Sequence, residues 1–254
     1  MKTANFSRIL VDAVQLCGLD RDEITDSTFT QLRDFANTRL RLAWEYDKWP
    51  DFIRFTHIPT IIESDSVYYV NKPSGAGEVI GVYDRNPNAN TRAVYVPFTI
   101  VHTNTEERIV INRNYTDGVW MEYRIEPITI NGEKWNASTA YSVGSQVYFD
   151  SGSDSGTYHA VAGKPQSGNF YTCITANTNT NPAQSTANWT IVNIPYIFSN
   201  YLPRGVFADY LRSEGQFDSA RIAESEAQSF LDLEIDKIVR QQGQVQKYNF
   251  IKSY

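Results

Sequence analysis

The chain has 254 residues, a formal net charge of −6 and an aromatic share of 13%. This length is enough for one large domain or two ordinary ones, each with a buried core. The negative net charge disfavours sequence-independent binding to nucleic-acid phosphates. The two cysteines fit neither a disulfide framework nor a CxxC metal site, and no apolar run reaches the roughly 20 residues of a membrane span. We therefore expect a protein made in the cytosol, without a membrane segment.

Residues 1–50 carry two amphipathic helical patterns. Gly18 predicts the end of the first helix, because glycine is common just past a helix C-terminus. Asp26 or Ser27 is the expected N-cap of a second helix that runs to about Tyr46. Three arginines of this second helix are expected to lie off its apolar stripe: Arg33, Arg39 and Arg41.

The sequence predicts an antiparallel β domain over residues 51–130. Short runs such as FIRFTHI, SVYYV, RIVINRN and VWMEYRIEP are rich in β-branched and aromatic residues, and turn-forming clusters such as DRNPNAN and NYTDG separate them. This spacing is typical of an antiparallel sheet or a small sandwich. A second, nearly uncharged β segment follows in residues 131–193.

The composition then changes to charged residues and helix formers. Residues 194–243 predict a helical hairpin with its turn at Gly215. Residues 244–254 have no acid and no helical period, so we expect an extended tail that orders on meeting a partner. The predicted fold is α+β. N- and C-terminal helices form one bundle, and an antiparallel β domain and a second small β module project from it as insertions.

No pattern predicts catalysis, a metal or a cofactor. The three histidines, His57, His102 and His159, lie in strand-like runs without a second ligand at metal spacing. Paired acids could in principle hydrolyse a glycan, and this stays open as a minor alternative. The acids considered are Glu106 with Glu107, Glu122 with Glu126, and Asp150 with Asp154.

Two helical stretches resemble the head-to-tail connector adaptors of tailed bacteriophages. They are AWEYDKWPDF and IPYIFSNYLPRGVFADYLRSEGQFDSARIAESEAQSFLDLEI. The resemblance implies a non-enzymatic virion protein of the neck, made in the host cytoplasm. It also implies a homo-oligomeric ring of about twelve copies that joins the portal protein to the next ring. DNA would pass through the ring without sequence-specific binding.

The C-terminal tail is the predicted contact with the portal or with a neighbouring subunit. It could dock aromatic side chains into pockets or add a strand to an exposed sheet edge. A frayed end without a partner is the other reading. The residues expected to make the contact are Lys247, Tyr248, Phe250, Lys252 and Tyr254.

The segment from Trp135 to Trp189 resembles the small chitin-binding type of carbohydrate-binding module. The matching positions are Trp135, Tyr141, Gly144, Val147, Phe149, Tyr171, Cys173 and Trp189. This chain departs from that pattern by a long segment, SGSDSGTYHAVAGKPQSG with its neighbours, where the family has a short turn.

The resemblance implies a possible surface-glycan site at Trp135, Tyr171 and Trp189, because aromatic faces stack on pyranose rings. The alternative is a purely structural role, in which these residues pack inside the module and Tyr141, Val147 and Cys173 form a miniature core. The main functional expectation is thus a neck adaptor. The alternative is a carbohydrate-binding tail or receptor-recognition protein.

Overall fold

The computed structural model describes residues 2–20, 24–62, 67–89, 92–103, 107–150 and 168–251, with residues 241–251 described by their backbone only. The fold is α+β, and four α-helices and several antiparallel sheets occur within these residues. The chain forms two compact units. The helical unit comprises Met1–Asp47 and Ile128–Tyr254, and the β unit comprises Lys48–Pro127.

The two N-terminal helices have nearly the predicted bounds. Helix α1 spans Phe6–Leu16 and is followed by Gly18 at φ +69°, a left-handed conformation that favours glycine. Helix α2 spans Asp26–Tyr46. Its N-cap is Thr25, one residue before the predicted position, because the Thr25 side chain accepts a hydrogen bond from the backbone N–H of Thr28 at 3.2 Å.

The C-terminal helices form the predicted hairpin. Helix α3 spans Tyr201–Ser213, helix α4 spans Phe217–Ile251, and Gly215 turns the chain between them at φ +77°. Helix α3 contacts α1, α2 and α4. A short antiparallel pair ties the N-terminus to the entry of this hairpin: β1 (Thr3–Ala4) pairs with β15 (Ile194–Pro195), and the 3-10 helix η4 (Tyr196–Phe198) leads into α3.

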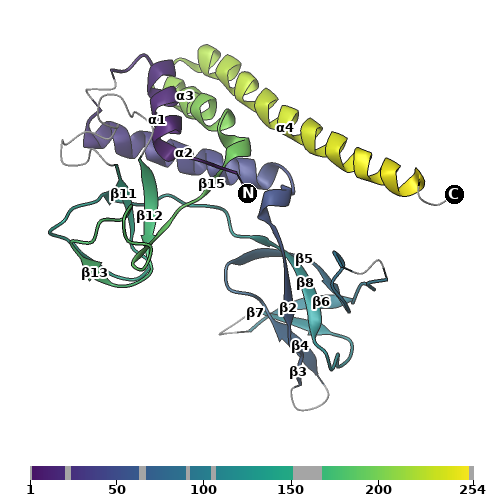
Figure 1. The fold of residues 1–254 in the computed structure, drawn as a ribbon. Helices are drawn as coiled ribbons and strands as arrows, with labels where there is room; N and C mark the ends of the chain where they lie inside the picture. Colours follow the sequence, from purple (N-terminus) through teal and green to yellow (C-terminus); the bar gives the residue numbers. More distant parts are fainter. Residues whose placement is uncertain are drawn as a thin grey trace. The chain divides into compact units, whose positions relative to one another are not determined.

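Helix α4 is longer than the sequence indicates. Its backbone continues through Ile251, so residues 244–251 are helical where an extended tail is expected. A helix that has already formed extends by one hydrogen bond per residue, and the single Gly243 costs only about 1 kcal/mol against that gain. Figure 1 shows α4 continuing well past the end of α3.

The second β module belongs to the helical unit. Its four-stranded sheet has the order β14-β12-β11-β9, in which β9 and β11 are parallel and the other pairs are antiparallel. The strands are β9 (Glu133–Lys134), β11 (Gln146–Phe149), β12 (Asn169–Cys173) and β14 (Trp189–Ile191). A small ladder joins β10 (Ala140–Tyr141) to β13 (Asn177–Thr178).

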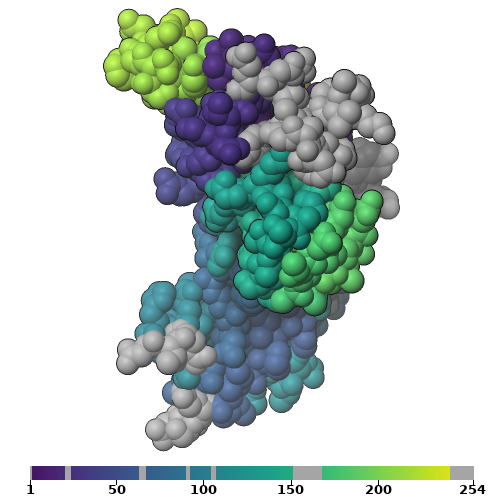
Figure 2. Space-filling model, turned by 90° about the vertical axis from the view of Figure 1, so that its left-hand side faces the viewer, coloured from purple at the N-terminus to yellow at the C-terminus, as the bar shows by residue number. Residues whose placement is uncertain are grey.

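This module packs directly on the N-terminal helices, so the prediction that it projects outward from them is wrong. Phe6 of α1 lies 4.8 Å from Phe170 of β12, and Phe29 of α2 lies 5.0 Å from Tyr148 of β11, measured between ring centroids. All four rings are buried. Aromatic pairs of this kind bury large apolar areas, which accounts for the attachment. In Figure 2 the teal and green atoms of the module lie against the purple atoms of the helices.

The β unit contains two antiparallel sheets over one core. One sheet has the order β2-β8-β5 and the other β3-β4-β7-β6. Their elements are η2 (Pro50–Phe52), β2 (Ile53–Ile58), β3 (Ile61–Ile62), β4 (Tyr68–Asn71), β5 (Ala76–Tyr83), β6 (Phe98–His102), β7 (Glu107–Ile111) and β8 (Val119–Ile125). Buried residues from both sheets form one cluster: Val70, Ala76, Val82, Val96, Ile109, Ile111, Val119, Met121 and Tyr123. The alternation along β8, where Val119, Met121 and Tyr123 point inward, produces this core.

Candidate functional site

One face of α4 is exposed and partly apolar. We define this outer face by Ile222, Ser225, Ser229 and Leu233, which recur at intervals of three and four residues and so share one side of a helix. Ile222 is 71% exposed and Leu233 45% exposed. A shallow hollow over Ile222, Ser225 and Ser229 marks the same face. Small serines between two apolar side chains would allow another helix to approach closely.

The opposite face of α4 packs into the helical unit. Its buried residues are Ala220, Ala223, Ala227 and Leu231. Arg204 of α3 reaches across the hairpin, donating to Glu226 at 2.8 Å while its guanidinium lies over the Phe230 ring. Tyr46 at the end of α2 donates to Asp232. Contacts from two helices thus fix the orientation of α4, and with it the outer face.

A buried arginine joins three helices. Arg39 of α2, which the sequence places off the apolar stripe of the helix, is only 1% exposed. Its Nε and Nη2 donate to the two carboxylate oxygens of Asp209 on α3, at 2.7 and 2.6 Å. Its Nη1 and Nη2 donate to those of Glu224 on α4, at 2.6 Å each. Arg212 also donates to both acids, at 2.7 and 2.9 Å, which gives a network of two arginines and two carboxylates.

The charges in this network stabilise one another. Burial acts to lower the pKa of Arg39, but its hydrogen bonds to Asp209 and Glu224 outweigh burial and raise that pKa above the usual range. The hydrogen bond from Arg39 lowers the pKa of Glu224 despite burial of its carboxyl group. At neutral pH Arg39 and Glu224 are therefore held in their charged forms.

Arg33 departs from its predicted place in the same way. It is buried, and its Nη1 donates to the backbone carbonyl of Gly132 at 3.2 Å and to Glu133 at 2.8 Å. This arginine therefore links α2 to the β module. Arg41 is exposed, as predicted.

The predicted tail residues are only partly described. Lys247, Tyr248 and Phe250 fall within the backbone of α4, and nothing is described of their side chains. Lys252 and Tyr254 lie outside the described residues. Their role in contacting another subunit stays a prediction.

Of the three predicted glycan-site aromatics, Trp189 lies in the core of the β module, and Trp135 and Tyr171 pack against that core. Trp189 is 2% exposed, donates through its indole N–H to the Thr180 carbonyl at 3.0 Å, and meets the Tyr141 ring edge-on. Trp135 and Tyr171 are half-buried and pack on the same cluster. Burial raises the pKa of Tyr171. Val147, Cys173 and Tyr141 also belong to this cluster, which confirms the miniature core.

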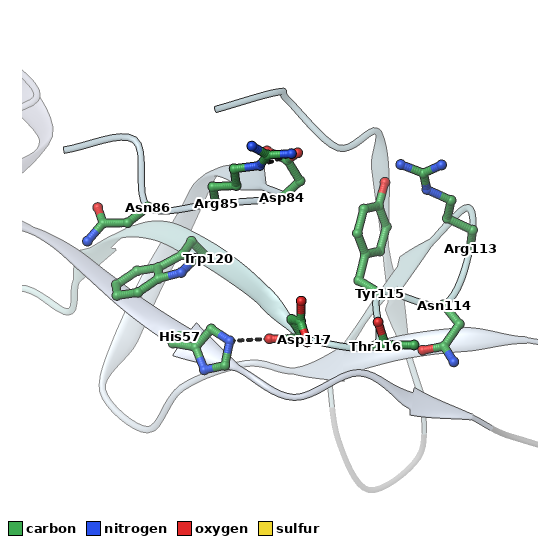
Figure 3. Close-up of a pocket in the computed structure, with 11 residues that line it drawn as sticks. His57, Asp84, Arg85, Asn86, Arg113, Asn114, Tyr115, Thr116, Asp117 and Trp120 are labelled. Atoms are coloured by element: carbon green, nitrogen blue, oxygen red, sulfur yellow. Dashed lines mark hydrogen bonds and ion pairs between the residues drawn. The ribbon is translucent and has the colours of Figure 1, made fainter. Parts of the chain in front are cut away.

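The β unit carries an open groove that the sequence analysis does not identify. It lies between the segment that follows β5 and the turn between β7 and β8, and its volume is about 570 Å³ (Figure 3). His57 and Trp120 lie along one part of it and Tyr115 along another. The sequence signal for this groove is the set of Asn, Asp, Arg and Tyr residues in DRNPNAN and NYTDG, two stretches whose pattern by itself predicts only turns.

The residues considered for chemistry do not converge in the described part of the chain. No group of three or more His, Cys, Asp or Glu side chains there is placed to hold a metal ion. Glu107 accepts from Lys72 at 2.7 Å and Glu122 accepts from Tyr83 at 2.9 Å. The remaining positions that fall outside the described residues are Glu106, Asp154 and His159.

None of the helices in the described residues has both the length and the apolar character that a membrane span requires. No protein-family model matches the chain, and comparison with curated proteins finds no match.

Proposed function

We propose that this chain is a structural virion protein of the neck, an adaptor that joins the portal to the next ring of the tail. In this proposal α1 to α4 act as one helical bundle, and copies of the chain assemble into a ring around the DNA channel. The observation that carries the proposal is the outer face of α4, an exposed and partly apolar helix face on an element that extends past its partner helix.

The dimensions of the hairpin support a docking role for α4. Helix α3 has 13 residues and α4 has 35, so α4 exceeds its partner by about 30 Å at 1.5 Å per residue. A helix of this length gains most of its stability from packing, and the surplus length offers a surface for another chain. On the outer face, the apolar residues Ile222 and Leu233 would be covered by a neighbouring helix of the ring or of the portal.

The network around Arg39 supports a scaffold with fixed geometry. Ring subunits must present the same surfaces in every copy, and a helix that shifted within the subunit would spoil this repetition. Arg39 holds α3 and α4 through four charge-assisted hydrogen bonds whose planar geometry restricts the orientation of both helices.

The charge balance is compatible with a DNA channel. With 29 Asp and Glu against 23 Lys and Arg, the net charge of −6 leaves no surplus of cations to neutralise phosphates, so DNA could pass without being retained. The alternative, a carbohydrate-binding tail protein that uses Trp135, Tyr171 and Trp189, has less support. Those rings pack within the β module, and stacking on a sugar requires an open ring face.

The proposal is tested by co-sedimentation of the purified full chain with portal rings from the same virus. Wild-type protein should bind, and the double variant Ile222→Glu/Leu233→Glu should bind roughly tenfold or more weakly, because burying a charge at each site replaces apolar contact. Val143→Glu is the matched control, since Val143 is 66% exposed in a turn of the β module. Equal binding by all three proteins would contradict the proposed role of the outer face.

A further inference from the structure

The groove of the β unit has the size and the framework of a small-ligand site. At about 570 Å³ it lies within the range of roughly 300–1,000 Å³ that is common for such sites. Two turns of a packed β structure supply it: residues 84–86 follow β5, and residues 113–118 connect β7 to β8. His57 of β2 donates through its Nε2–H to the backbone carbonyl of Asp117 in this second turn.

Two aromatic rings are available in the groove. Trp120 projects from β8, and the His57 ring lies against it with a centroid distance of 5.5 Å. Tyr115 lies on the turn, with the Arg113 guanidinium 4.8 Å from its ring centroid. Figure 3 shows Trp120 and Tyr115 on different sides of Asp117. The Trp120 side chain lines the groove, and its indole N–H is a group that can donate a hydrogen bond.

The polar groups of the groove are numerous, and their charges balance. Arg85 and Arg113 contribute two positive charges, and Asp84 and Asp117 contribute two negative ones. Asp84 is held in place by Arg85 at 3.3 Å and by the backbone N–H of Val94 at 2.7 Å. Asn114 is exposed and offers both a donor and an acceptor. The groove therefore presents many hydrogen-bonding groups, and the formal charges of these four side chains sum to zero.

We propose that this groove binds a neutral oligosaccharide. Hydroxyl groups are both donors and acceptors, and they match a mixture of guanidinium, carboxylate and amide groups. The apolar C–H face of a pyranose suits the Trp120 or Tyr115 ring. A phosphate backbone suits the groove less well, because two carboxylates offset the two arginines and leave no surplus positive charge. The site is separate from the aromatic residues of the β module, and it does not depend on the neck assignment.

The test is isothermal titration of the purified full chain against an array of neutral oligosaccharides, with single-stranded DNA as the competing ligand. A neutral oligosaccharide should bind, and Asn114→Ala and Arg113→Ala should each weaken binding by about three- to tenfold, the usual effect of losing one hydrogen bond. Both side chains are exposed, so the variants are expected to fold.

Two controls in the same unit isolate the groove. Arg108→Ala removes a guanidinium that lies over the Tyr69 ring outside the groove, and Asn88→Ala removes an exposed amide from the neighbouring turn. Both controls should bind like wild type. The proposal is overturned if no neutral oligosaccharide binds, or if the groove variants and the controls bind equally. It is also overturned if only DNA binds, with an affinity that falls steeply as salt is raised.

Discussion

Gly205 of α3 lies directly beside the aliphatic part of Arg39 on α2, and a Cβ atom at position 205 would stand 2.8 Å from Arg39 Cδ. Arg39 cannot easily move away, because Asp209 and Glu224 hold its guanidinium through four hydrogen bonds. The absence of a side chain at position 205 therefore allows the buried arginine to reach its two acids.

Gly205→Ala should consequently destabilise the helical unit. Alanine favours a helix over glycine by about 1 kcal/mol, but the close contact with Arg39 opposes this gain. In an Arg39→Ala background the contact is absent, and the same change should be neutral or stabilising. Chemical denaturation of the wild type, Gly205→Ala, Arg39→Ala and the double variant measures the coupling energy between the two positions. Additive changes in the free energy of unfolding would contradict the contact.

Arg39→Ala should cost about 3–5 kcal/mol of unfolding free energy. The substitution leaves Asp209 and Glu224 facing each other with Arg212 as their remaining cation. Arg41→Ala is the control, because this exposed arginine of the same helix should change stability by only about 0.5 kcal/mol. Hydrogen exchange resolved by peptide shows whether the loss falls on α2, α3 and α4, because it reports the stability of each segment separately.

Glu224 should make the helical unit sensitive to acid. The hydrogen bond from Arg39 lowers the pKa of Glu224 below its ordinary value of 4.5. Its stabilising contribution is therefore complete above that ordinary value and is lost as the pH falls through the lower pKa of the folded protein.

Glu224→Gln should thus be less stable than wild type at pH 7, and the difference should shrink as the pH falls below about 4.5. Melting temperatures of both proteins between pH 7 and pH 3 measure this. A constant difference over that range would show that Glu224 does not titrate with a lowered pKa.

Trp189→Ala should act on stability, because the indole is buried among Val147, Cys173 and Tyr141. Loss of a buried aromatic side chain costs about 3–5 kcal/mol, and faster hydrogen exchange in β11 and β12 would report it. Ile174→Ala serves as the control, since Ile174 is exposed in the same module. Unchanged exchange in Trp189→Ala would contradict the core role.

The sequence pattern predicted helices and turns well where residues close together in the sequence determine them. Helical periodicity gave α1, α2 and α3, and the glycines at 18 and 215 marked turns that need a positive φ. The miniature core of the β module agrees with the packing alternative to the carbohydrate-binding resemblance, in which Tyr141, Val147 and Cys173 lie together. The continuation of α4 past Gly243 was missed because composition alone favoured an extended tail there.

Contacts between residues that lie far apart in the sequence could not be predicted from local patterns. Arg39 looks like a surface residue of α2, because its acids lie 170 and 185 residues away in the sequence. Tyr148 and Phe170 alternate with the miniature core, and nothing local indicates that their side of the sheet meets Phe6 and Phe29. The groove of the β unit combines two turns that only the folded sheets bring together.

Cross-linking mass spectrometry on the intact virus particle tests the neck assignment most directly. The lysines to follow are Lys237 and Lys247 on α4, with Lys72 of the β unit as an internal reference. The account predicts links from Lys237 and Lys247 to the portal subunit or to a second copy of this chain. Links from these lysines only to tail-tip or fibre proteins would contradict it and favour a receptor-recognition protein.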